Sequence, residues 1–135
     1  MKIDGSCHCG YLTYEAEADP EKTSICHCAD CQTLSGSPFR ASVPVAAADF
    51  HFLSGEPAVY VKVADSGNRR AQTFCPKCAS QIYSTSADDP NAMRALRVGS
   101  IRQRDKFVPR RQIWGRSRQP WADDLRDIPR VEGQT

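Results

Sequence analysis

Cys26, Cys28 and Cys31 place three thiols within six residues, as a Cys-x-Cys step that runs directly into a Cys-x-x-Cys step. Residues i and i+2 of an extended segment point to the same side, so Cys26 and Cys28 can face one point, and a following turn can bring Cys31 to it. Three converging thiolates suit a soft or borderline metal, of which zinc is the default. A closed structural zinc site has four protein ligands, whereas a catalytic one keeps a position open. This group, called the triplet below, therefore predicts a zinc ion with an exchangeable fourth position.

The other four cysteines form two pairs that are far apart in the chain, Cys7 with Cys9 and Cys75 with Cys78. Only these two pairs add up to four ligands without splitting the triplet. We therefore expect them to form a structural zinc site with four thiolates, so that the chain holds two zinc ions. Such a site can supply much of a small domain's folding free energy, because the unfolded chain has no preformed site.

Other uses of the thiols are a disulfide framework, a metal-free reactive cluster or redox sensor at the triplet, and an iron–sulfur centre. The chain has seven cysteines, and an odd number would leave one unpaired in a disulfide framework. The chain begins without the apolar stretch of a secretory signal and has no apolar run of membrane-spanning length. We therefore expect a cytoplasmic protein, in a compartment where clustered thiols stay reduced and bind metal.

His8 and His27 each stand between two cysteines. On an extended segment their side chains would point away from the metal and pack or hydrogen-bond nearby. His27 is still a candidate catalytic residue, because it could orient a substrate or move a proton beside the open site.

A zinc ion with three thiolates has a formal charge of −1, so its Lewis acidity is weaker than that of zinc held by neutral imidazoles. Deep lowering of the pKa of a bound water is less plausible at such a site. A fourth thiolate supplied by a substrate suits the open position better, because coordination keeps a thiol deprotonated. The triplet thus indicates chemistry in which a thiolate adds to a small carbonyl or leaves from the adduct.

The formal net charge of +2 is unevenly distributed. Residues 1–90 hold 7 Lys+Arg and 11 Asp+Glu, whereas residues 91–135 hold 11 and 5. A basic C-terminal third could attract a small anion or a nucleic acid. Trp114 and Trp121 lie in this third among arginines, where they could form a stacking platform or be ordinary core tryptophans.

The remaining pattern is of short extended segments between turn signals, with no long amphipathic helix. We expect strands at the ranges 11–16, 39–43, 50–53, 58–63, 70–74, 81–84, 93–98 and 111–114, an extended segment at 23–25, and one helical turn at 32–34. In the first strand Leu12, Tyr14 and Ala16 should share a face. At 135 residues this predicts one all-β domain stapled by zinc, over residues 1–121, followed by a polar tail over 122–135.

The ordered motifs resemble the glutathione-dependent formaldehyde-activating (GFA) family, which includes centromere protein V-like proteins. They are the stretches 5–10, 26–32 with 35–37, 74–78, 113–114 and 117–121. The resemblance implies a β-tent fold of small coiled sheets with two zinc ions. Position by position, Cys7, Cys9, Cys75 and Cys78 match the structural zinc site, and Cys26, Cys28 and Cys31 match the catalytic one. The family usually has glycine where this chain has Ala79, so we expect a turn there that is either slightly strained or of a different type.

The resemblance implies a carbon–sulfur lyase that makes or breaks S-hydroxymethylglutathione or a related glutathione conjugate. Glutathione and an aldehyde would be its small-molecule partners, and no membrane partner is expected. The alternative is a non-enzymatic zinc module that binds protein or nucleic acid through the basic C-terminal third, although we do not favour nucleic acid. The sequence leaves the oligomeric state open, a homodimer included.

Overall fold

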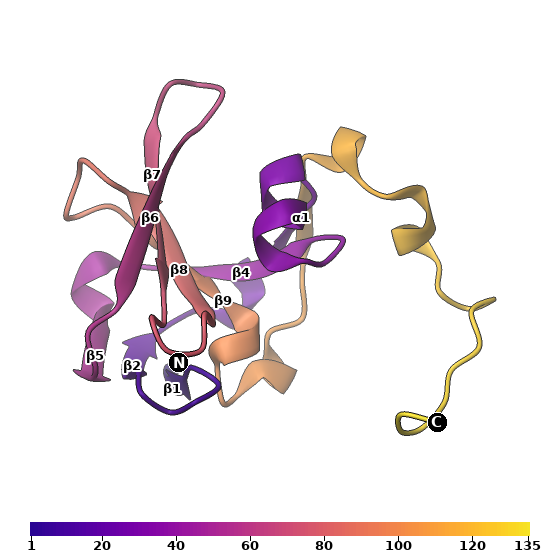
Figure 1. Ribbon diagram of the computed structural model, residues 1–135, viewed down its shortest axis with the longest axis horizontal. Helices are drawn as coiled ribbons and strands as arrows, with labels where there is room; N and C mark the ends of the chain where they lie inside the picture. Colours follow the sequence, from indigo (N-terminus) through magenta and orange to yellow (C-terminus); the bar gives the residue numbers. More distant parts are fainter.

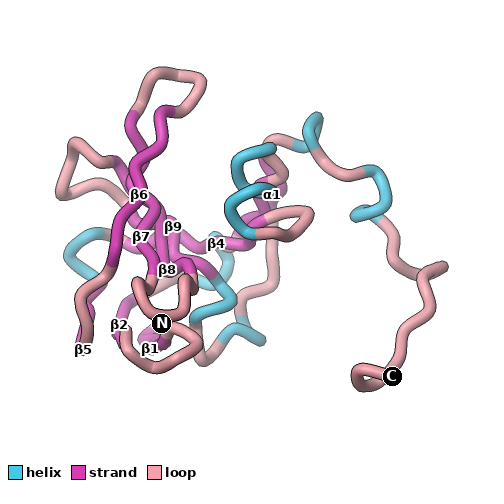
Figure 2. Tube along the Cα trace, in the orientation of Figure 1, coloured by secondary structure: helices cyan, strands magenta, loops and turns pink.

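The computed structural model describes residues 1–135 and consists mainly of two β-sheets with one α-helix (Figures 1 and 2). The three-stranded sheet has the strand order β1-β2-β5 and the seven-stranded sheet has the order β10-β3-β4-β9-β8-β7-β6. The all-β prediction is confirmed. The elements are β1 (Lys2–Ser6), β2 (Thr13–Glu17), β3 (Ser24–Cys26), α1 (Ala29–Ser35), β4 (Arg40–Val45), β5 (Phe50–Ser54), β6 (Ala58–Val63), β7 (Arg69–Phe74), β8 (Gln81–Ser86), β9 (Arg94–Arg97) and β10 (Arg111–Ile113).

The small sheet confirms the alternation expected for the first strand, because Leu12, Tyr14 and Ala16 are all buried. Its outer strand β1 was not predicted, since Lys2–Ser6 contains few residues that favour strands. Antiparallel pairing with β2 forms it instead. Gly5 is required in this strand, because a Cβ atom there would overlap the Tyr14 ring and the Ser100 carbonyl.

The core lies where the apolar face of the seven-stranded sheet packs on the small sheet. Phe50 is central, with ring centroids 5.0 Å from both Tyr14 and Tyr83. Val43 of β4 and Leu96 of β9 pair across their strands and are fully buried against these rings. The short strands are therefore held by one shared apolar layer.

The opposite face of the seven-stranded sheet is polar. The register aligns Arg111, Ser24, Ser42 and Arg97 in one row across β10, β3, β4 and β9. In the next row Cys26 pairs with Arg40. Helix α1 contacts the seven-stranded sheet through an ion pair and a hydrogen bond. Asp30 pairs with Lys62 of β6 at 2.6 Å, and the Leu34 carbonyl accepts a hydrogen bond from the Gln81 side chain at 2.7 Å.

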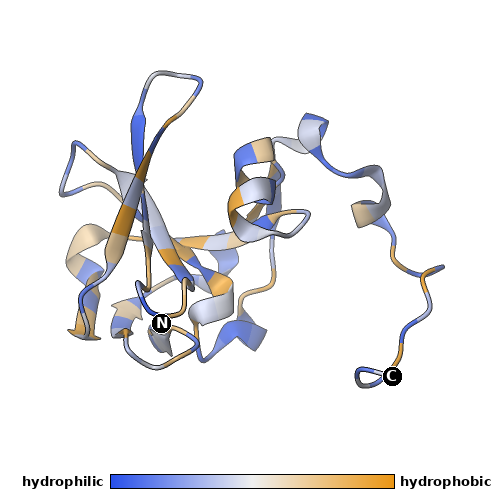
Figure 3. Ribbon diagram, viewed as in Figure 1, coloured by the Kyte–Doolittle hydropathy of each residue, from blue (hydrophilic) through white to orange (hydrophobic).

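The β6–β7 hairpin projects beyond the rest of the fold (Figure 1). Strand β6 is an edge strand, and the apolar colouring along it (Figure 3) matches the exposure of Val59, Val61 and Val63. Here alternation in the sequence does not correspond to burial, because no second layer covers the hairpin.

The C-terminal segment leaves the body of the fold after β10 (Figure 1). It contains the short 3-10 helices Gly115–Ser117 and Pro120–Asp123, and residues 123–135 are all exposed. Nowhere does the structure contain a helix whose length and apolar character would let it cross a membrane.

Candidate metal centres

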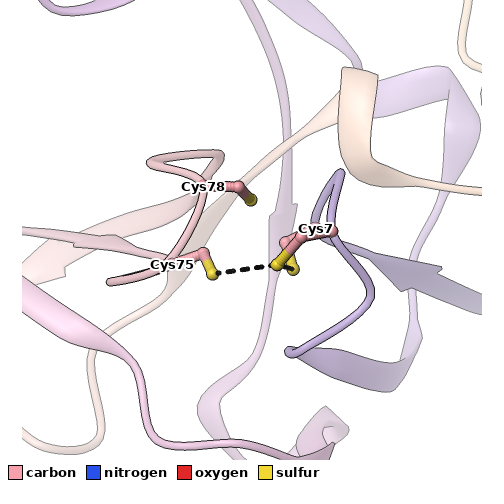
Figure 4. A group of neighbouring side chains, drawn as sticks. Cys7, Cys75 and Cys78 are labelled. Carbon is pink, nitrogen blue, oxygen red and sulfur yellow. Dashed lines mark hydrogen bonds between the residues drawn. The ribbon is translucent and has the colours of Figure 1, made fainter.

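The sulfur atoms of Cys7, Cys9, Cys75 and Cys78 converge, each within 4.8 Å of the others. Figure 4 shows the sulfurs of Cys7, Cys75 and Cys78 turned toward one point from two separate loops. The Cys9 sulfur is 3.6 Å from that of Cys7 and 3.8 Å from that of Cys75. Four sulfurs on one tetrahedral zinc at about 2.3 Å lie about 3.8 Å apart. The four-cysteine cluster therefore has the spacing that a zinc ion requires.

Two tight turns build this cluster. The first loop turns at Gly10, where a φ of 84° suits glycine. The second loop closes with the Ala79 amide donating to the Cys75 carbonyl at 2.8 Å. Ala79 has a φ of 64°, so the strained backbone expected at this position is present.

Hydrogen bonds to sulfur surround the same cluster. The amide of Leu12 donates to the Cys7 sulfur at 3.2 Å, and that of Lys77 donates to the Cys75 sulfur at 3.4 Å. The Ser80 hydroxyl lies 3.2 Å from the Cys78 sulfur and holds the pKa of that thiol at about 5. Donors aimed at sulfur favour the thiolate form that a metal binds.

The triplet occupies the junction between β3 and α1. Cys26 ends the strand, Cys28 caps the helix, and Cys31 lies in the first helical turn. Their three sulfurs lie within 4.8 Å of one another. The helix spans Ala29–Ser35, so the single turn expected at 32–34 was too short and began too late. The turn that brings Cys31 back is the helix itself.

Two arginines lie behind the triplet that sequence reasoning did not identify. Arg40 is buried, and Arg97 is half-buried. Their guanidinium groups donate to the same side-chain oxygen of Gln72, at 3.1 and 3.4 Å. No carboxylate pairs with either one, and the Nε atom of each lacks a partner. No spacing in the sequence places an arginine at the triplet. Only the pairing of β3 with β4 sets Arg40 beside Cys26.

Burial without a counter-charge is unfavourable for these cations. Burial, reinforced by the neighbouring Arg40, lowers the pKa of Arg97 to about 10. The triplet supplies the compensating negative charge. The neighbouring Cys26 thiol and the Arg40 guanidinium together hold the pKa of Cys31 at about 5, while proximity to Cys31 raises the pKa of Cys26. Cys31 is thus the thiol whose anionic form these neighbours favour.

His27 is buried and takes no part in the sulfur cluster. Its Nε2 atom lies 2.7 Å from the side-chain oxygen of Gln112, and its ring meets Phe39 edge-on with centroids 5.6 Å apart. Nδ1 has no partner. The ring lines a cavity of about 450 Å³ with Arg110 and Arg111. A catalytic role for His27 stays a prediction.

The two tryptophans are not core residues, which corrects one of the two interpretations of the sequence. Trp114 is 44% exposed and Trp121 is 52% exposed. Arg116 lies over the Trp114 ring, 4.7 Å from its centroid. All seven cysteines are free thiols, so the disulfide alternative has no support.

Comparison with known proteins gives a family match and a fold match. The profile described as "Glutathione-dependent formaldehyde-activating enzyme" matches residues 2–117. A crystal structure of a Rhodobacter sphaeroides protein, a structural genomics target, superposes with a TM-score of 0.61 at 17% identity, over 81% of this chain and 98% of that one. At that identity the likeness shows the fold alone. No curated protein matches.

Proposed function

This chain belongs to the glutathione-dependent formaldehyde-activating family, whose enzymes are in general carbon–sulfur lyases, and from that premise we propose that it acts as a zinc-dependent member. The reaction would make or break a thiol–aldehyde adduct, with S-hydroxymethylglutathione or a related glutathione conjugate as the substrate. The observation that carries this proposal is the convergence of only three sulfurs at the triplet, beside the buried Arg40 and the half-buried Arg97.

Cys26, Cys28 and Cys31 would hold a zinc ion, whose chemistry is to keep a substrate thiol deprotonated. The four-cysteine cluster would hold a second zinc ion with a structural role. Three thiolates and Zn²⁺ carry a formal charge of −1, and a fourth thiolate adds another negative charge. Arg40 and Arg97 offset this charge, which favours binding of an anionic sulfur.

In the condensing direction the substrate's sulfur adds to the aldehyde carbon. A carbon–sulfur bond forms, the carbonyl π electrons move to oxygen, and that oxygen takes up the proton that the thiol lost. His27 could pass this proton, since its Nδ1 atom has no other partner and Gln112 orients the ring from the other side. The reverse order of events breaks the adduct.

Cys28→Ser tests this proposal, because Cys28 belongs to the triplet and lies outside the core cluster. Native mass spectrometry of the wild-type protein should show two zinc ions per chain and a glutathione adduct. The variant should keep the fold and one zinc ion, and should lose both the adduct and thiol-dependent turnover. A variant that still binds glutathione and turns over at the wild-type rate would overturn the proposal.

The exposed tryptophans favour a second candidate, a module that binds a protein or nucleic acid through Trp114 and Trp121. Duplex DNA binding that weakens steeply with salt would support it. Saturable glutathione binding without DNA affinity would support the enzyme.

A further inference from the structure

The outer edge of β6 has no bonding partner within the chain. Strand β6 ends the seven-stranded sheet, in a hairpin that projects beyond the rest of the fold (Figure 1). Its pairing with β7 runs over six positions without a bulge, and no backbone hydrogen bond outside this ladder involves residues 58–63.

This edge also lacks the features that usually prevent another strand from pairing with it, which are a free charge, a proline or a bulge. Strand β6 has no proline. Its one charged residue, Lys62, pairs with Asp30 of α1 at 2.6 Å, and only 18% of the Lys62 side chain is exposed. The edge is therefore open to a strand from outside.

The hairpin shows which residues of β6 turn their backbone groups outward. At the turn the Ala64 amide donates to the Asn68 carbonyl at 2.8 Å. Bonded and non-bonded positions alternate along an antiparallel pair, so the even-numbered residues of β6 bond to β7. The amides and carbonyls of Val59, Val61 and Val63 therefore point away from the sheet.

These three valines can pair with the same three residues of a second copy of the chain. With a twofold axis at Val61, an antiparallel register places Val61 opposite its counterpart and Val59 opposite Val63 of the other copy. Each bonded pair exchanges two hydrogen bonds, so the ladder would contain about six. It would end at Pro57, which has no amide to donate.

The side chains fit the same register. The valines lie on the face opposite Lys62 and α1, and are 39–68% exposed. Across the twofold axis they would lie beside those of the other copy, which is a favourable pairing of β-branched residues. On the other face Tyr60 would lie opposite Lys62 of the second copy, so no like charges meet.

We propose that β6 is a dimer interface, through which two copies join their seven-stranded sheets edge to edge in antiparallel register. A twofold pairing occupies both edges and closes at two copies. Six residues from each copy bury less than the about 1,200 Å² of a standard interface. The dimer is therefore reversible, with a Kd on the order of 10–100 µM.

Sedimentation equilibrium of the full-length protein as purified, from about 1 µM to 1 mM, tests this interface. The wild-type protein should pass from monomer to dimer over that range. Val61→Pro removes an outward amide without taking a hydrogen bond from β7, and should weaken the dimer about tenfold or more. Val61→Lys places two like charges on the twofold axis and should do the same. Circular dichroism shows whether each variant keeps its fold.

Val108→Lys is the matched control, because Val108 is 52% exposed and lies outside every helix and strand. It should dimerise as the wild-type protein does. A wild-type protein that stays monomeric to about 1 mM would overturn the proposal and leave the edge to a strand of another protein. So would a dimer that survives both Val61 substitutions, or one that Val108→Lys also disrupts.

A pair of charge substitutions tests the register itself. Val59→Lys and Val63→Glu should each weaken the dimer, since each sets a charge against a valine of the other copy. In the double variant every new ammonium group faces a new carboxylate across the interface. It should dimerise about fivefold more tightly than either single variant. A double variant that dimerises more weakly than both would overturn the register centred on Val61.

Discussion

The four-cysteine cluster joins two loops whose sulfurs are 66 residues apart in sequence, whereas the triplet lies within one strand-to-helix junction. The first has four sulfurs with backbone amides directed at them. The second has three, with the buried Arg40 and the half-buried Arg97 behind them. Under the proposed function the same residue type would serve two purposes: ligands from distant segments would stabilise the fold, and a local set of three would leave a position for a ligand from outside.

The strongest test of this contrast is to remove one sulfur from each cluster. Cys75→Ser should unfold the protein or remove most of its stability, which for a domain of this size is about 5–15 kcal/mol. The reason is that the loops near Cys7 and Cys78 lose their shared metal. Thermal unfolding followed by circular dichroism, with zinc content measured in parallel, should show this loss, while Cys28→Ser unfolds near the wild-type temperature. Equal destabilisation by both substitutions would contradict the division of roles.

A smaller effect is expected when the positive charge of Arg40, next to the triplet, is removed. Arg40→Gln should weaken metal binding at the triplet about tenfold, since a shift of one pKa unit in a thiol ligand is worth about 1.4 kcal/mol. Competition with a chromophoric chelator measures this affinity, and the four-cysteine cluster should keep its metal throughout. Arg40→Lys retains the charge and should lie close to the wild-type value. If it binds as weakly as Arg40→Gln, packing rather than charge is responsible.

The smallest effect concerns the backbone of the four-cysteine cluster. Ala79→Gly should raise the free energy of unfolding by about 0.5–1 kcal/mol, because glycine adopts the left-handed conformation without strain. Gly10→Ala is the matched opposite: its φ is 84° and an added Cβ would touch nothing, so it should destabilise by about 1 kcal/mol through the backbone alone. Urea unfolding of the metal-loaded proteins measures both. A stability change of the same sign in the two variants would contradict this account.

Sequence reasoning succeeded where residue type and spacing alone decide the answer. The partition of the cysteines into a set of four and a set of three agrees with the convergence of the sulfurs, because ligand counting needs no knowledge of the strand order. That Leu12, Tyr14 and Ala16 share a face followed from alternation alone, and the structure shows that this face is the buried one.

Sequence reasoning failed where the pairing of strands decides the structure. Strand β1 forms through its partner and not through its own composition. The valines of β6 alternate along the strand but stay exposed. An alternating pattern does not show whether another layer of the fold covers the apolar face. Arg40 reaches Cys26 through a cross-strand register, and no spacing in the sequence indicates that pairing.

The span of the four-cysteine cluster also has a consequence for biosynthesis. The thiols of the triplet leave the ribosome together, within six residues of chain, whereas Cys7 and Cys9 must wait for Cys78 to emerge. Closing a loop of 66 residues rather than one of about five raises the entropic cost of loop closure by about 2 kcal/mol. If both clusters bind metal, a nascent chain would therefore be able to fill the triplet before the four-cysteine cluster can close.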